Sequence, residues 1–220
     1  EALLAGSYTF STFRRFEIRD PKPRIIHAPV FRDRVVHHAL VAQIGPVLER
    51  SLVFDTYACR TRKGTLAAVL RAQQHSWRCR WYLKTDIRQY FASISQRIVN
   101  EQLQRRFKDR GLLTLCRQVL DSFHTTPGRG LPIGALTSQY FANCYLDGLD
   151  RLLLETLRVG GMVRYMDDVV WWGDDRAELI QSLPAVRDFL EKALLLELKP
   201  NWQLQRTRCG LSFCGFRVFP

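Results

Sequence analysis

With 220 residues, the chain is long enough to form one good-sized hydrophobic core or two small ones. Hydrophobic residues make up 46% of it and charged residues 25%, an ordinary globular composition that argues against a long disordered region. The 33 Lys and Arg residues outnumber the 21 Asp and Glu residues and give a net charge of +12, which predicts an anionic partner, with nucleic acid ahead of a membrane surface.

The sequence lacks the features of a membrane or secreted protein. No apolar run approaches the roughly 18 to 20 residues of a spanning helix, and the N-terminus shows no basic leader and no cleavage site. The six cysteines include no C-x-x-C pair, and no His lies at zinc-finger spacing, so we expect reduced thiols and no structural zinc. We therefore expect a cytoplasmic protein that does not engage a membrane.

The first part of the chain predicts extended segments followed by helices. Prolines and arginines recur over residues 8–36, a pattern typical of extended segments and turns with a basic face. Apolar residues at helical spacing predict a helix over residues 34–52, which Pro46 should kink or restart. A basic loop, "DTYACRTRKGT", and a short helix, "LAAVLRAQQH", come next. The β-branched and aromatic residues of "RWYLKT" then predict a strand that ends near Asp86.

The second part alternates helices with strands. Residues 96–123 are predicted to be helical with an Arg-rich outer face, and a Gly- and Pro-rich loop leads into a helix from about Thr137. Two short apolar runs around residues 166–168 predict a hairpin. Asp175 is suited to cap a helix that runs to about Leu198, and the last eleven residues alternate like a strand. This order predicts an α+β fold with helices packed on an antiparallel sheet.

Two adjacent carboxylates, Asp167 and Asp168, lie at the tip of the predicted hairpin between apolar residues. Burying a carboxylate costs several kcal/mol unless a cation or hydrogen-bond donors compensate, although a plain hairpin turn with acids facing water needs neither. If Asp86 ends a neighbouring strand, all three acids can meet on one edge of the sheet. Such oxygen ligands suit Mg²⁺, and two ions about 4 Å apart can activate a hydroxyl and stabilise a leaving pyrophosphate.

Four sequence blocks resemble, in order, the consecutive motifs of reverse transcriptases: "KPRIIHAPVFRDRVVHHAL", "LKTDIRQYFASI", "RGLPIGALTSQYFANCYLDGLD" and "YMDD". The resemblance extends over nearly the whole chain. It implies an RNA-directed DNA polymerase with the right-hand polymerase fold. Fingers would occupy residues 1–80 with a contribution from 95–130, and a palm with the catalytic hairpin would occupy 81–220. These enzymes continue into a helical thumb after a strand like "FCGFRV", so we expect a chain without a thumb.

The resemblance also implies roles for individual residues. Asp86 and Asp167 would be metal ligands, with help from the main-chain carbonyl of Ile87, and Asp168 would lie beside the metals. Two Mg²⁺ ions are implied as cofactors, with Mn²⁺ as a substitute. An RNA template, a DNA or RNA primer and dNTPs are implied as partners, and a structured RNA and an accessory protein are further candidates.

The remaining candidate residues follow from position within the matching blocks. For the incoming nucleotide they are Arg24, Phe91, Ile133 and Gly134, and for nucleic acid they are Lys22, Lys63, Gly64 and Gln139. Each has an ordinary structural alternative. Phe91 could be a core residue, Lys22 a solvated surface charge and Gly134 a plain loop glycine.

The branch of the family is indicated by Ile133. Group II intron and retroviral enzymes usually carry Gln before the Gly of the "LPIG" block, and Ile at this position, with "LTSQ", most resembles the enzymes of diversity-generating retroelements, which implies error-prone synthesis. Retron and bacterial defence reverse transcriptases are close competitors. Two other classes remain open: a polymerase-like scaffold that binds structured RNA, and a two-metal nuclease.

Overall fold

The computed structural model describes residues 2–3, 5–19 and 23–220. Over these residues helices and strands alternate along the chain, and the predicted α+β class is confirmed. No helix in this described part is long and apolar enough to cross a membrane.

The chain divides into two compact units, and each is built from two separate stretches of sequence. The first unit consists of Glu1–Arg50 and Phe91–Tyr145, and the second of Ser51–Tyr90 and Leu146–Pro220. Residues 51–80 thus belong to the second unit. The division into fingers and palm stays a prediction.

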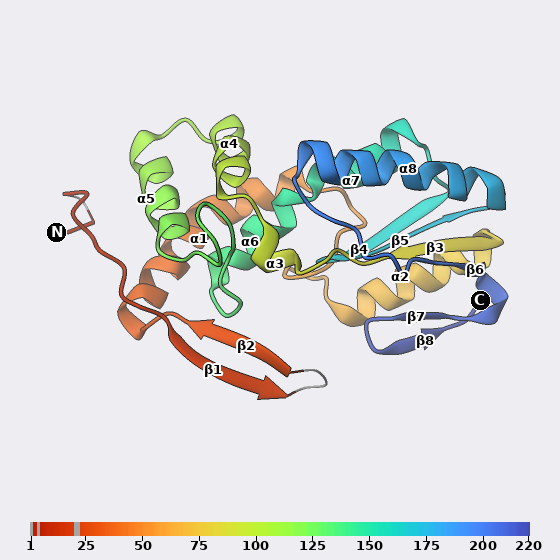
Figure 1. Ribbon diagram of the computed structural model, residues 1–220, viewed down its shortest axis with the longest axis horizontal. Helices are drawn as coiled ribbons and strands as arrows, with labels where there is room; N and C mark the ends of the chain where they lie inside the picture. The colour runs from red at the N-terminus through yellow and green to blue at the C-terminus, as the bar shows by residue number, and fades with distance from the viewer. Residues whose placement is uncertain (1, 4, 20–22) are drawn as a thin grey trace. The chain divides into compact units, whose positions relative to one another are not determined.

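The first unit begins with a hairpin and a long helix. Strand β1 (Arg14–Arg19) pairs antiparallel with β2 (Pro23–Ala28), as Figure 1 shows, so the expected extended segments are confirmed. Helix α1 (Phe31–Ser51) is continuous through Pro46, so the predicted restart was wrong and the kink stays a prediction. Pro46 and Ala42, whose carbonyl loses its helical partner, are both exposed, so water can take over the lost hydrogen bond.

The predicted single helix over residues 96–123 is two helices in the structure, α4 (Gln96–Arg106) and α5 (Arg110–Asp121). The break has a local cause, because the carboxylate of Asp109 accepts a hydrogen bond from the main-chain amide of Leu112 at 2.7 Å and caps α5. The first unit also contains the short helix α3 (Tyr90–Ser93) and helix α6 (Leu136–Tyr145), which begins within one residue of its predicted start.

The second unit is organised around a four-stranded antiparallel sheet. Its strand order is β4-β5-β3-β6. The strands are β3 (Trp81–Thr85), β4 (Gly161–Tyr165), β5 (Asp168–Gly173) and β6 (Gln203–Arg206). Strand β3 ends directly before Asp86 and β4 and β5 form a hairpin, so both predictions are confirmed.

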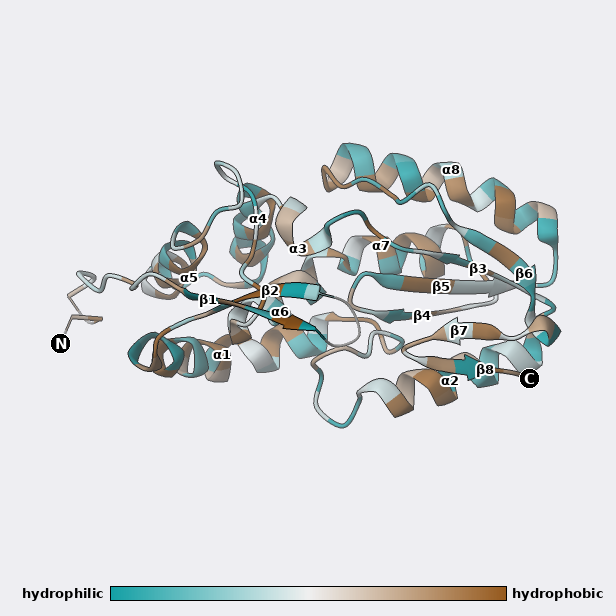
Figure 2. Cartoon of the chain, turned by 60° about the horizontal axis from the view of Figure 1, so that its bottom comes forward, coloured by the Kyte–Doolittle hydropathy of each residue, from teal (hydrophilic) through white to brown (hydrophobic). Residues whose placement is uncertain are grey.

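Two neighbouring tryptophans show how the sheet is covered on both faces. Successive side chains of a strand point to opposite faces, and Trp171 and Trp172 of β5 are both fully buried. The indole N–H of Trp171 donates to Ser182 of helix α8 (Arg176–Ala193) at 3.0 Å. That of Trp172 donates to Ser76 of helix α2 (Thr65–Arg78) at 3.2 Å. Helices α8 and α2 therefore lie on opposite faces of the sheet, as Figure 2 shows.

Two expectations about the end of the second unit were wrong in detail. Helix α8 is capped by Asp175 as predicted, but it ends at Ala193 and not near Leu198. The terminal alternating segment is not one strand but a hairpin of β7 (Leu211–Phe213) and β8 (Phe216–Val218) on the α2 side. Its two turn residues both have positive φ, 50° and 83°, which reverses the chain within two positions.

The elements between α6 and the β4–β5 hairpin complete the second unit. Helix α7 (Asp147–Arg151) continues directly into a π-helical turn, Leu152–Thr156. Helix α7 packs against α8 and holds Asp150, which is fully buried.

The cap of α5 provides a test of the helix break. Asp109→Ala should lower the free energy of unfolding by about 1 kcal/mol, because the first amides of α5 lose their acceptor. Urea denaturation followed by circular dichroism would measure the change. Asp121→Ala is the matched control, since Asp121 ends α5 and forms an exposed ion pair with Arg117, and it should change the value by no more than about 0.5 kcal/mol. Equal losses for both variants would contradict the role of the cap.

Candidate active site

The turn between β4 and β5, which carries the first of the two adjacent acids, is only two residues long. Tyr165 of β4 pairs with Asp168 of β5, so Met166 and Asp167 form the whole connection. Met166 has a φ of 59°, a conformation that Gly adopts freely and that is uncommon for a residue with a branched or long side chain. Strained positions of this kind are typical of functional sites, and here the strain presents Asp167 at the tip of the hairpin.

A buried ion pair between Arg164 and Asp150 stabilises this turn. The guanidinium of Arg164, with 0% of its side chain exposed, makes two hydrogen bonds of 2.7 Å to the carboxylate of Asp150. The guanidinium also donates a third hydrogen bond, to the carbonyl oxygen of Met166 at 3.0 Å. Asp150 also accepts from the hydroxyl of Thr56 at 2.9 Å. Both charges are thus compensated, and the fork of Arg164 fixes the main chain of the turn to the helix layer.

The structure brings Asp86, Asp167 and Asp168 together at one edge of the sheet. Burial raises the pKa of Asp167 to about 6, and the neighbouring charge of Asp86 is the second cause. A hydrogen bond to Asp86 and the charge of Asp168 raise this pKa further. Burial also raises the pKa of Asp168, against the opposing effect of Lys84. Carboxylates this close repel one another, so the cluster is stable as anions only where positive charge is supplied.

Two lysines supply part of that charge. Lys84 of β3 donates to Asp168 at 2.8 Å and to the carbonyl of Ser212 at 2.8 Å. Lys199 forms an ion pair with Asp86. Our sequence interpretation missed both lysines. Lys84 lies on β3, two positions before Asp86, which is a usable signal, whereas nothing local in the sequence connects Lys199 with Asp86.

The segment after α8 explains how Lys199 reaches the acids. The amide of Lys199 donates to the carbonyl of Asp86 at 2.9 Å, and the amide of Arg88 donates to the carbonyl of Glu197 at 2.8 Å. These two bonds flank the bridge between Ile87 and Leu198 and leave the Ile87 carbonyl out of the pairing. Ile87 is buried, with 1% of its surface exposed, so its side chain anchors the loop that presents Asp86.

The donor set of this cluster fits a hard divalent cation. All donors are carboxylate oxygens, and Oδ1 of Asp168 is buried with no hydrogen-bond partner among the described residues. An unpartnered carboxylate oxygen is costly to bury, and a cation would compensate it. Within the described residues, no three acidic, His or Cys side chains are already grouped as a metal site. The two lysines hold one oxygen each of Asp86 and Asp168, and a cation would compete with them.

The candidate residues for the incoming nucleotide all lie in the first unit. Arg24 is exposed on β2 and lines a pocket of about 600 Å³ whose lining comes from both strands of the hairpin. Gly134 has a φ of 121°, and a Cβ there would lie 2.8 Å from the side chain of Ile26 and 3.0 Å from the carbonyl of His27. The close approach of β2 therefore requires glycine at position 134 for structural reasons alone.

Neighbouring contacts position the other candidates of this unit. The carbonyl of Ile133 accepts from the amide of His27 at 2.7 Å, which ties the "LPIG" loop to β2. The carbonyl of Phe91 accepts from the amide of Leu131 at 2.8 Å, and the Phe91 side chain is half-buried. Gln139 is half-buried on α6.

The remaining nucleic-acid candidates belong to the second unit or fall outside the description. The ammonium of Lys63 lies over the rings of Phe54 and Tyr57, at 3.7 Å and 4.5 Å from their centroids. Gly64 begins α2 with a φ of 121°. Lys22 lies outside the described residues.

Comparison with solved structures defines the class of fold. The structure of telomerase from Candida albicans in complex with a fragment of telomeric RNA is similar with a TM-score of 0.69 and 12% identity, covering 96% of this chain and 44% of that one. Apo telomerase from Candida tropicalis is similar with a TM-score of 0.67 and 10% identity, covering 96% and 47%. At this level of identity the likeness concerns the fold, an antiparallel sheet backed by helices.

Comparison of sequences shows the family. Residues 19–202 match the family described as reverse transcriptase (RNA-dependent DNA polymerase), and the chain belongs to that family. It is 26% identical over 168 residues to protein YkfC of Escherichia coli, covering 70% of this chain and 44% of that protein. It is 23% identical over 165 residues to the group II intron-encoded protein LtrA of Lactococcus lactis, covering 70% and 27%. It is 25% identical over 158 residues to the putative COX1/OXI3 intron 2 protein of Saccharomyces cerevisiae, covering 66% and 18%. The chain thus spans less than half the length of these relatives.

The buried ion pair behind the turn can be tested by stability. Asp150→Ala should lower the free energy of unfolding by about 3 to 5 kcal/mol, because the guanidinium of Arg164 stays buried without its counterion. Chemical denaturation would measure this. The control is Glu155→Ala, which removes an exposed partner of Arg151 and should cost at most about 1 kcal/mol. A loss for Asp150→Ala no larger than for the control would show that the pair does not hold the turn.

Proposed function

We propose that this protein is an RNA-directed DNA polymerase that extends a primer 3′-hydroxyl with dNTPs on an RNA template. The observation that carries the proposal is the cluster of Asp86, Asp167 and Asp168 at one sheet edge, with Asp167 on a strained two-residue turn and Asp168 directly after it. The family match and the likeness to telomerase structures support the same activity. The cytoplasmic location expected from the sequence is part of this proposal.

The chain's own residues would divide the work as follows. Asp86, Asp167 and the Ile87 carbonyl would hold two Mg²⁺ ions, or Mn²⁺ in their place, and Asp168 would lie beside them. The bound ions would supply the charge that favours a nucleophilic primer hydroxyl and a pyrophosphate leaving group. The Asp150 and Arg164 pair fixes the turn that aims Asp167, and Lys84 holds Asp168.

The first unit would contribute the contacts to the substrate. In this proposal Arg24 binds the triphosphate, since a guanidinium suits phosphate oxygens, and Phe91 lies beneath the sugar. Gly134 and Ile133 contact the nascent base pair, while Lys22, Lys63, Gly64 and Gln139 contact nucleic acid. A structured RNA and an accessory protein are proposed as further partners, and residues 1–80 and 81–220 as fingers and palm.

Primer extension with acid variants tests the activity. Asp86→Asn and Asp167→Asn keep the size of the side chain but remove the anion, so synthesis should fall by orders of magnitude while RNA binding is retained. Asp188→Asn on the exposed face of α8 is the control with the same change of charge and should extend normally.

The outcomes separate the competing classes of protein. Near-normal synthesis by either acid variant would contradict the assignment of the site. RNA binding without any acid-dependent synthesis would identify a scaffold, and shortening of the primer would identify a nuclease.

The finer part of the proposal is that synthesis is error-prone, as in diversity-generating retroelements. Where most relatives present a Gln amide, Ile133 offers no side-chain donor or acceptor. One polar contact worth about 1 to 2 kcal/mol corresponds to roughly tenfold in discrimination between correct and wrong pairs. The proposal rests on the "LPIG" and "LTSQ" blocks, and retron or defence enzymes are its competitors.

Sequencing of cDNA tests this subtype. The unaltered protein should misincorporate mainly opposite template adenines, and Ile133→Gln should lower that rate about tenfold on the same template. Ile133→Val, which stays apolar, is the control and should leave the errors unchanged. Equal error rates opposite all four bases would remove the retroelement assignment.

A further inference from the structure

The second unit has a pocket at the end of the sheet opposite the catalytic turn. Its volume is about 930 Å³, and its walls come from the end of α2, the start of β3, the end of β5 and the turn after β6. Trp81 begins β3 and Asp86 follows its end, so about 17 Å of strand separates the pocket from the acids. The side chains that dominate its lining are Arg78, Arg80, Arg206, Arg208, Trp77 and Trp81.

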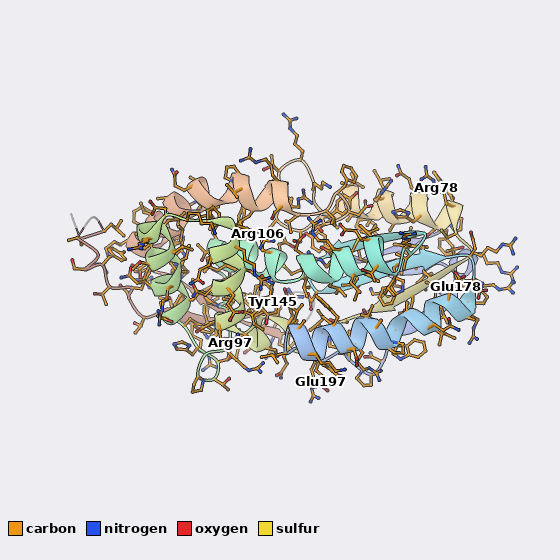
Figure 3. All side chains as sticks on the ribbon, turned by 90° about the horizontal axis from the view of Figure 1, so that it is seen from above. Arg78, Arg97, Arg106, Tyr145, Glu178 and Glu197 are labelled. Carbon is orange, nitrogen blue, oxygen red and sulfur yellow. The ribbon has the colours of Figure 1, made fainter. Side chains whose placement is uncertain are left out.

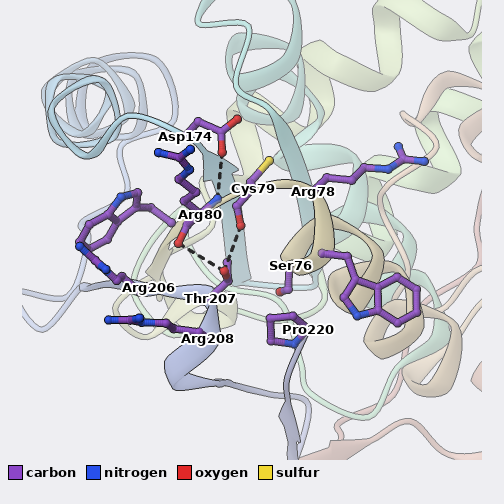
Figure 4. Close-up of a pocket in the computed structure, with 11 residues that line it drawn as sticks. Ser76, Arg78, Cys79, Arg80, Asp174, Arg206, Thr207, Arg208 and Pro220 are labelled. Carbon is purple, nitrogen blue, oxygen red and sulfur yellow. Dashed lines mark hydrogen bonds between the residues drawn. The ribbon is translucent and has the colours of Figure 1, made fainter.

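Hydrogen bonds between segments distant in sequence build the pocket floor. The hydroxyl of Thr207 donates to the carbonyl of Cys79 at 3.0 Å, and its amide donates to the carbonyl of Arg80 at 3.0 Å. The amide of Arg80 donates to the carboxylate of Asp174 at 3.0 Å. These main-chain links, drawn as dashed lines in Figure 4, leave the arginine side chains themselves available.

The pocket is strongly positive. Four of its lining residues are arginines, and within the described residues none of their guanidinium groups forms an ion pair with a carboxylate. Figure 4 shows Arg80, Arg206 and Arg208 on one side, while the side chain of Arg78 extends outward on the other side, and Figure 3 shows Arg78 at the end of α2. The lining holds one carboxylate, that of Asp174, so arginines outnumber acids four to one, and the pocket attracts an anion with several negative groups.

The pocket also offers aromatic faces. Trp77 is 63% exposed, which is unusual for the largest apolar side chain and leaves its ring open to a ligand. The guanidinium of Arg206 lies 5.1 Å from the ring centroid of Trp81, so this aromatic face is already used for a cation–π contact. Guanidinium groups that bind phosphates, next to an open indole on which a base can stack, are the two elements of single-stranded nucleic-acid binding.

We propose that this pocket binds a single-stranded segment of RNA, separate from the template and primer at the catalytic acids. The arginines bind successive phosphates and Trp77 stacks on a base. RNA is preferred over a membrane surface because the arginines line a hollow of about 930 Å³ and not a flat face. The site would hold part of a bound RNA in place while another part is copied. The binding site is defined by its own residues, and only its role during copying rests on the proposed polymerase activity.

Binding of a short RNA to the full chain tests the site. A labelled eight-nucleotide RNA of mixed sequence is titrated by fluorescence anisotropy, with unlabelled template–primer duplex present in excess to occupy the catalytic side. Arg80→Ala combined with Arg208→Ala should weaken binding about tenfold or more, because charge-assisted contacts to phosphate are lost. The slope of log affinity against log salt should become shallower by about 1.4. The matched control, Arg158→Ala combined with Arg187→Ala, removes two exposed arginines of the same unit outside the pocket and should change neither value.

A second arm tests the stacking. Trp77→Ala should weaken binding of the RNA about tenfold, and should leave unchanged the binding of an abasic oligomer with the same number of phosphates. Circular dichroism of each variant shows that the fold is retained, which is expected because these side chains are exposed.

Three results would overturn the proposal. Equal losses in the pocket variant and the control variant would mean that RNA binds the basic surface at large. Equal affinity for natural and abasic oligomers would mean that the pocket recognises charge alone. Binding of a free nucleoside triphosphate as tightly as the oligomer would assign the pocket to a nucleotide. Primer extension by the pocket variant is measured separately, so failure of the polymerase proposal would be distinguishable from failure of this one.

Discussion

The turn that presents Asp167 depends on one buried ion pair, between Arg164 and Asp150. A fully buried guanidinium and carboxylate are tolerable only when each satisfies the other, and here the remaining capacity is used by Thr56 and by the carbonyl of Met166. The pair therefore does more than compensate charge. It connects helix α7 with the tip of the hairpin, so that the strained conformation of Met166 is held by the layer beneath it.

Charge is distributed unevenly over the sheet of the second unit. At one end of β3, carboxylates crowd together and depend on Lys84, Lys199 and any bound cation for compensation. At the other end, arginines gather around a pocket with little opposing charge. A sheet is a stiff support, so its two ends can hold opposite charge without either cluster neutralising the other. In the two proposals made above, the acidic end would handle the reacting phosphate and the basic end would attract the RNA strand.

The acidic residues of the candidate site could be found from the sequence, whereas the lysine side chains that pair with them could not. A doublet of Asp residues inside an apolar hairpin, with a third Asp ending another strand, is a local and unusual pattern. Lys199 reaches Asp86 across 113 positions, by a route that depends on where α8 ends. The reason for Gly134 was also hidden, because the close approach of β2 is a contact between distant segments.

The sequence by itself determined the α+β class, the hairpin with its acids, most strands and helices, and the family, because periodicity, turn chemistry and ordered motifs are properties of neighbouring residues. It misjudged the break at Asp109 and the continuity of α1 through Pro46, where one side chain or one exposed carbonyl outweighs the pattern. Only the tertiary structure decided which basic groups meet the acids and which gather around the second pocket. Those arrangements join chain segments that periodicity cannot relate, and their free energy comes from burial and charge compensation, which exist only once the chain has folded.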